Sequence, residues 1–64
     1  MDPMLKWFAY DHLKSPLKEV SREFHGLAVF VCGACVPGPE RTVALRKLLE
    51  AKDAAVRAMV NPGG

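Results

Sequence analysis

The fold of this chain is decided by residues 39–61, PERTVALRKLLEAKDAAVRAMVN. Apolar residues recur there at spacings of three, four and seven, with charged residues largely between them, which is the pattern of an amphipathic helix with one apolar stripe. Pro39 suits a first helical turn, Glu40 favours the positive end of the helix dipole, and Asn61-Pro62 ends the run. The sequence therefore predicts a helix over residues 39–61. Weak surface ion pairs are predicted between residues four apart, namely Arg46 with Glu50 and Asp53 with Arg57.

A second helix is predicted over residues 15–36, upstream of this stretch. Ser15 is expected to cap it and Pro16 to occupy its first position. One face carries apolar residues at helical spacing, namely Leu17, Val20, Phe24, Leu27 and Val31. Residues 27–32, LAVFVC, are apolar all round and rich in β-branched residues, so a strand is the less favoured alternative there.

The two helices are expected to form an antiparallel hairpin. A turn at residues 37–38 joins them, and short connections of this kind pair helices of similar length side by side. Residues 1–14 precede the hairpin as a short helix or an extended arm, and residues 62–64 form a tail. The expected fold is a single all-α domain spanning residues 1–64.

The size of the chain predicts self-association. A chain of 64 residues has a marginal core, since a domain near this size removes only about 60% of its unfolded surface from water. An all-round apolar helix end needs cover on more than one side, which a two-helix hairpin cannot give. We therefore expect a homo-oligomer.

The charge, hydropathy and length of the sequence argue against several classes of function. Nine Lys and Arg against seven Asp and Glu give a net charge of +2, too little for a protein that grips duplex nucleic acid through many phosphates. The start of the chain lacks the pattern of a signal peptide, and the longest uncharged stretch, residues 27–39, is too short to cross a bilayer. The sequence thus predicts a cytosolic protein that does not act on membranes. Its length also argues against an enzyme, because a catalytic cleft needs a larger rigid scaffold.

Cys32 and Cys35 form a CxxC spacing, which could be a redox pair or half a zinc site. The sequence lacks the βαβ setting of a redox pair, and zinc would need His12 and His25 from a distance. The favoured interpretation is two small apolar residues in a buried helix end. No metal or cofactor is therefore expected.

Several side chains could instead contact a ligand. Tyr10 could stack on a flat ring, whereas Trp7 and Phe8 are expected to fill a helix interface. His25 could be a metal ligand, a donor to a ligand or a partly buried structural histidine, and Arg22 lies one turn away from it.

Arg41 and Thr42 sit beside free backbone N–H groups at the start of residues 39–61, which could form an anion site. Glu40 competes for the same end of the dipole, so a capped, solvated helix start is the alternative.

Residues 39–58 resemble the second hairpin helix of phage-encoded anti-CBASS and anti-Thoeris signal sponges, which share a helical hairpin domain. The likeness lies in the acidic-basic-hydroxyl start Glu40-Arg41-Thr42, the Leu-x-x-Leu and Glu-Ala core and the alanine-rich end. Upstream, residues 8–10 (FAY) and 25–28 (HGLA) are similar to the family's entry segment and first hairpin helix, so the resemblance covers residues 7–60.

The resemblance implies a protein of the infected bacterial host's cytoplasm that sequesters cyclic di- or trinucleotide messengers, such as 3′,3′-cGAMP-like ligands, without cleaving them. Such sponges are homo-oligomers, often hexamers, with pockets between protomers. Tyr10 would match the aromatic residue that stacks on a base, and Arg22 or His25 the basic residue that contacts phosphate, although relatives carry lysine at the position of His25. Arg41 and Thr42 would contact phosphate or ribose in a second kind of pocket.

A function of another class is kept as the alternative. The chain could be a structural or protein-interaction hairpin that docks its apolar stripe and aromatic arm on a partner helix, with no small-molecule ligand. Replacement of Tyr10 separates the two, since the sponge would lose its ligand whereas the interaction hairpin would lose its assembly.

Overall fold

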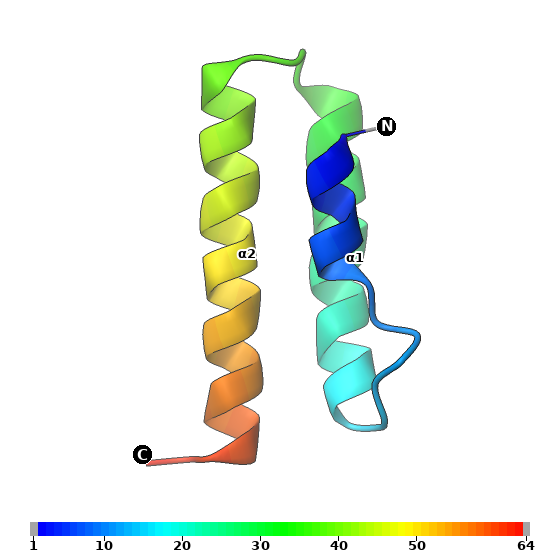
Figure 1. The fold of residues 1–64 in the computed structure, drawn as a ribbon, viewed down its shortest axis with the longest axis vertical. Coiled ribbons are helices and arrows are strands. Elements are labelled where there is room, and N and C mark those ends of the chain that lie inside the picture. Colours follow the sequence, from blue (N-terminus) through cyan, green and yellow to red (C-terminus); the bar gives the residue numbers. More distant parts are fainter. Residues whose placement is uncertain (1, 64) are drawn as a thin grey trace.

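The structure is a computed structural model that describes residues 2–63. It contains three helices, the 3-10 helix η1 (Pro3–Phe8) and the α-helices α1 (Leu17–Ala34) and α2 (Pro39–Val60). Helices α1 and α2 run antiparallel side by side, and η1 lies along α1 (Figure 1). The prediction of an all-α hairpin is confirmed, and of the two alternatives left open for the N-terminal segment, a short helix or an extended arm, residues 3–8 form the short helix. The strand alternative over residues 27–32 is wrong, because those residues lie within α1.

The helix ends differ slightly from their predicted positions. Helix α1 begins at Leu17 with Pro16 as its N-cap residue, so the predicted cap at Ser15 is wrong. The Ser15 hydroxyl instead donates to the Glu19 carboxylate at 2.5 Å. Helix α1 ends at Ala34 rather than at residue 36, because Cys35 is extended and Pro37 disfavours helix in the residue before it. Helix α2 ends at Val60, where the Asn61 N–H donates to the Arg57 carbonyl at 2.8 Å.

The core is small and lies where η1 meets the two long helices. It consists of Leu5 and Phe8 from η1, Ala28 from α1 and Leu45 from α2, and both Phe8 and Leu45 are fully buried. The interface role predicted for Phe8 is confirmed. The same role for Trp7 is wrong, since its side chain is 59% exposed. Side chains three residues apart in a 3-10 helix lie on the same side, as Leu5 and Phe8 do here, and Trp7 points about 120° away from them.

Helix α1 carries apolar residues that the described part of the chain leaves exposed. Leu27 is 48% exposed and Phe30 is 68% exposed, Val29 is also exposed, and so is Val36 just beyond the end of α1. Cys32 is half-buried and Cys35 is exposed, and both thiols are free, so the predicted burial of both cysteines fails for Cys35. Among residues 2–63, no helix combines the length and apolar character that a membrane span requires.

The predicted ion pairs on α2 are replaced by others. Lys47 pairs with Glu50 at 3.8 Å, and Lys52 pairs with Asp53 at 3.3 Å. Within the described residues neither Arg46 nor Arg57 joins an ion pair, so the pairs predicted from a spacing of four residues are wrong. Exposed charges gain little from pairing, so small differences in side-chain conformation decide between the alternatives.

Candidate functional site

Tyr10 and His25 meet at the middle of α1. The chain leaves η1 and turns at Asp11-His12, where the Leu13 N–H donates to the Tyr10 carbonyl at 3.0 Å, and this turn holds Tyr10 against the helix. The two rings pack edge to face, with centroids 5.3 Å apart and planes at 67°. Both side chains are half-buried, so each ring keeps an accessible part. The structure thus brings together two of the residues singled out from the sequence.

Arg22 lies one helical turn before His25 and is exposed. Its guanidinium is near enough to Glu19 to contribute to the lowered pKa of that carboxyl, after the larger effects of the Ser15 hydroxyl and the backbone hydrogen bond. Part of the Arg22 charge is therefore offset by Glu19. The Tyr10–His25 pair and Arg22 form the first candidate site.

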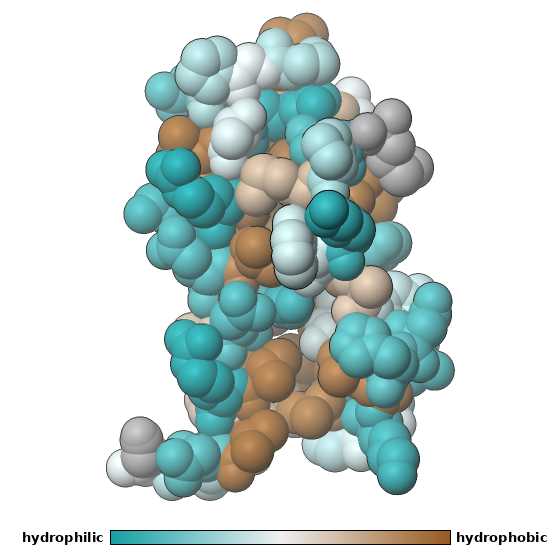
Figure 2. Space-filling view, viewed as in Figure 1, coloured by the Kyte–Doolittle hydropathy of each residue, from teal (hydrophilic) through white to brown (hydrophobic). Residues whose placement is uncertain are grey.

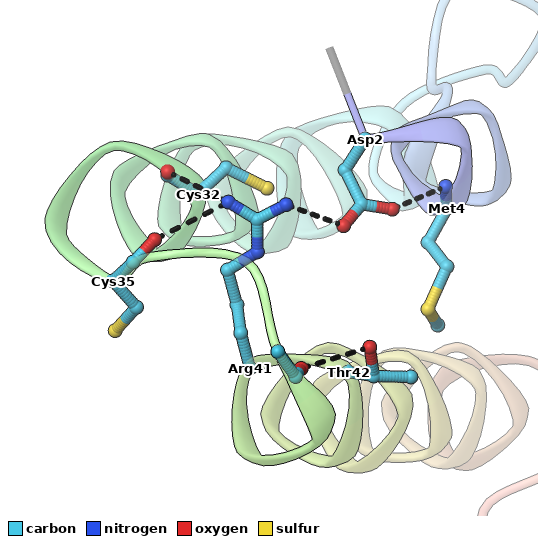
Figure 3. A network of polar contacts seen from close by, with 7 residues as sticks. Asp2, Met4, Cys32, Cys35, Arg41 and Thr42 are labelled. Atoms are coloured by element: carbon cyan, nitrogen blue, oxygen red, sulfur yellow. Dashed lines mark hydrogen bonds and ion pairs between the residues drawn. The ribbon is translucent and has the colours of Figure 1, made fainter.

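Arg41 forms a polar clamp at the hairpin end, which we call the Asp2–Arg41 clamp (Figure 3). Its Nη1 donates to the carbonyl oxygens of Cys32 and Cys35, each at 3.2 Å, and its Nη2 donates to Asp2 Oδ2 at 3.0 Å. The side chains of Arg41 and Asp2 are each only 12% exposed. The other Asp2 carboxylate oxygen accepts the Met4 N–H at 2.9 Å and so caps η1.

The clamp supplies the positive charge that the C-terminal end of α1 lacks. The last carbonyl groups of a helix have no partners within it, and the negative end of its dipole favours a cation. Helix α1 has no basic residue in its last turn. Arg41 supplies that cation from α2, and Asp2 balances the charge from η1. The guanidinium is thus already bound by three acceptor groups of its own chain, two carbonyls at the end of α1 and the Asp2 carboxylate.

Thr42 also uses its polar group within the chain, since its hydroxyl donates to the Gly38 carbonyl at 3.2 Å. The anion site and the capped, solvated helix start considered for Arg41 and Thr42 both leave out these contacts within the chain. Cys32, which Arg41 contacts, lies seven residues beyond His25 on α1, or about 10 Å along the helix. Within one chain, the five predicted site residues therefore fall into two separate groups.

Three polar residues with structural consequences were not singled out from the sequence, namely Asp2, Ser21 and Lys52. The Lys52 side chain is 13% exposed, and its Nζ donates to the Trp7 carbonyl at 2.8 Å and lies 5.9 Å from the centre of the Phe8 ring. It ties α2 to η1. The signal for Lys52 was its register, because it lies seven residues after the buried Leu45, on the apolar stripe.

The CxxC pair is not part of a larger cluster. Residues 2–63 contain no group of three or more His, Cys, Asp or Glu side chains arranged to hold a metal ion. Both sulfurs lie at the hairpin end of α1, beside the clamp (Figure 3). The main-chain carbonyls of Cys32 and Cys35, rather than their thiols, make the contacts described above.

Comparison with protein families, with curated proteins and with solved structures finds no match to this chain.

Proposed function

We propose that this chain binds cyclic di- or trinucleotide second messengers and sequesters them intact, in the cytoplasm of an infected bacterial host. The observation that carries the proposal is the edge-to-face pair of Tyr10 and His25, beside the exposed cation of Arg22. A cyclic oligonucleotide offers flat bases and two or three anionic phosphates. The Tyr10 ring, packed on His25, could stack on a base, and the Arg22 cation, one turn before His25 on α1, could contact a phosphate.

The pocket of the proposal is completed by a second copy of the chain. One protomer leaves apolar side chains on α1 uncovered, including Leu27 and Phe30, and the core of its described residues contains only four buried apolar residues. Association of copies through this face would bury these side chains, and a symmetric ligand suits a symmetric interface. The resemblance of residues 7–60 to the sponge family favours a hexamer.

The Asp2–Arg41 clamp limits the second pocket that the resemblance implies. A phosphate that contacted Arg41 would compete with Asp2 and with two carbonyl oxygens for the same guanidinium. We therefore assign the primary ligand contact to Tyr10, His25 and Arg22. In the proposal, Arg41 and Thr42 contact ligand only at edges of the guanidinium and hydroxyl that the clamp leaves free.

Native mass spectrometry of the purified protein, alone and with cyclic di- and trinucleotides, tests the proposal. We expect an oligomer that retains a ligand of unchanged mass, since sequestration breaks no bond. Calorimetry with Tyr10→Ala should show binding weakened about tenfold or more, because base stacking on an aromatic ring contributes about 1–3 kcal/mol. The oligomer should survive this change. Arg46→Ala is the matched control, since Arg46 is exposed on α2 and joins no ion pair among residues 2–63.

Two results would refute the proposal. The first is that calorimetry detects no binding of any cyclic di- or trinucleotide. The second is that Tyr10→Ala loses the oligomer, which would favour the protein-interaction hairpin. That alternative has an observation of its own, since Trp7, Leu27 and Phe30 are large apolar side chains left exposed by the fold. It predicts that a partner helix covers this surface and that Tyr10 acts in docking.

A further inference from the structure

A pocket of about 490 Å³ opens between η1, the turn that follows it, α1 and α2. Figure 2 shows the face on which it lies, hollowed between the lower half of α2 and the segment after η1, with apolar side chains inside the hollow and polar ones around it. Neither Tyr10 nor His25 lines this pocket. It is therefore distinct from the site of the proposed function and is contained within one chain.

Positive charge predominates in the lining. Lys6, Lys52 and Arg57 line the pocket, together with the single carboxylate of Asp53. Asp53 pairs with Lys52 at 3.3 Å, whereas Lys6 and Arg57 take part in no ion pair within the described residues. Lys6 and Arg57 are exposed, and two such cations at the mouth of an apolar hollow attract an anionic ligand by a Coulomb force that added salt would weaken.

Ser21 supplies a second, independent sign of a ligand. It lines the pocket, its side chain is completely buried, and its hydroxyl has no hydrogen-bond partner in the structure. A buried polar group without a partner destabilises the folded chain, because it has lost its hydrogen bonds to water. A phosphate oxygen would accept the Ser21 proton and remove this cost. A lining side chain has to shift to expose the hydroxyl, and the lysine side chains in the lining have flexible four-carbon stems.

Trp7 gives the pocket a flat apolar wall. Its indole is 59% exposed although it lines the pocket, and the Lys6 ammonium lies 5.2 Å from the ring centre. An indole of this kind stacks on any aromatic base, and the neighbouring cation suits the phosphate attached to such a base. We propose that this pocket binds a nucleoside monophosphate, with the phosphate held by Arg57, Lys6 and the Ser21 hydroxyl and the base stacked on Trp7.

The fluorescence of Trp7 tests the proposal directly, because Trp7 is the only tryptophan of the chain. Titration with adenosine 5′-monophosphate should change the emission saturably, and inorganic phosphate should reverse the change by competition. Arg57→Gln should weaken binding about tenfold, the effect of losing one charge-assisted contact worth about 1.4 kcal/mol. Ser21→Ala should weaken it about fivefold without unfolding the chain, since the hydroxyl has no partner to lose.

The control is Arg46→Gln, which makes the same charge change at an exposed position of the same helix that does not line the pocket. Its affinity should equal that of the wild type. A titration without saturation would overturn the proposal, and so would equal weakening by Arg57→Gln and Arg46→Gln, which would indicate only general attraction of anions.

Failure of this inference is distinguishable from failure of the proposed function. Arg57→Gln should leave the binding of cyclic dinucleotides unchanged, whereas Tyr10→Ala should weaken that binding about tenfold or more and leave the Trp7 signal with adenosine monophosphate intact. If Arg57→Gln weakened both ligands equally, the two sites would not be separate and the inference would be wrong.

Discussion

Replacement of Arg41 by alanine should destabilise the chain by about 3 kcal/mol, because a hydrogen bond to a charged group contributes about 1.5–3 kcal/mol and this guanidinium makes three that cannot simply be added. Removing one partner of a buried ion pair costs about 3–5 kcal/mol. The lower end applies here, since each side chain is 12% exposed and Asp2 keeps the Met4 N–H as a donor.

This loss is large for so small a domain, since about 0.05–0.15 kcal/mol per residue corresponds to a total of roughly 3–10 kcal/mol for this chain. Urea unfolding followed by helical circular dichroism measures it, at one protein concentration because self-association would shift the midpoint. Arg46→Ala is the control and should change stability by less than about 0.5 kcal/mol.

A double-mutant cycle with Asp2→Asn isolates the ion pair from the two carbonyl contacts. The coupling between Arg41 and Asp2 should be about 1–2 kcal/mol. A loss below about 1 kcal/mol in Arg41→Ala, or additive effects in the cycle, would refute the view that the clamp joins the three helices. Arg41 would then be free for the ligand contact that the resemblance assigns to it.

Three further changes test the packing and the charges. Phe8→Ala should cost about 3–5 kcal/mol in the same urea experiment, because the ring is fully buried, and a cost near zero would show that η1 does not dock. Gly33→Ala should raise stability by about 0.5–1 kcal/mol, since a Cβ there meets open space within the chain, and a loss of the oligomer would instead show that another copy packs against Gly33. Ser15→Ala should raise the pKa of Glu19 towards its ordinary value of 4.5, as measured by NMR titration of the carboxyl, because the Ser15 hydrogen bond is the largest cause of the lowered pKa. The stabilising effect of a depressed carboxyl pKa is present above pH 4.5 and is lost as the pH falls below it. The free energy of unfolding of Ser15→Ala should therefore fall less steeply with acid than that of the wild type. An unchanged titration of Glu19 would contradict the hydrogen bond.

The two long helices were predictable because their signals are strong and local. The apolar period of residues 39–61 defines α2 along nearly its whole length, and Pro39 and Asn61 mark its ends. The end of α1 was placed two residues too late, at residue 36 instead of Ala34. Pro37 disfavours helical conformation in the residue before it, and the spacing of apolar residues does not show this effect.

The N-terminal segment was not predictable to the same depth. Residues 3–8 are too few to show a period, so the sequence did not show that Phe8 would be buried and Trp7 exposed. That difference depends on which side of a short 3-10 helix meets the hairpin. Tertiary packing decides this orientation, and the sequence of the segment alone does not. The contact of Tyr10 with His25 follows from the same docking.

The clearest signal missed in the sequence is a polar residue at a position of the helix that faces the core. Arg41 and Lys52 lie four residues before and seven residues after Leu45, on the buried side of α2, and Ser21 lies seven residues before the buried Ala28 on α1. All three contribute to a structural tie or to a pocket. A polar residue inside an apolar stripe needs a partner, which makes such positions worth testing for function.

The ties that hold η1 also set the order in which the chain opens and closes. Asp2 bonds to Arg41 across 39 residues and the Trp7 carbonyl to Lys52 across 45, whereas α1 and α2 can pair progressively from their turn. Contacts between distant residues form late and break early, so we expect the segment up to Tyr10 to detach as a unit while the hairpin persists. Tyr10 and Trp7 would leave together, and both proposed sites would disappear in one event. Amide hydrogen exchange in residues 4–10 would therefore report how long either ligand can stay bound.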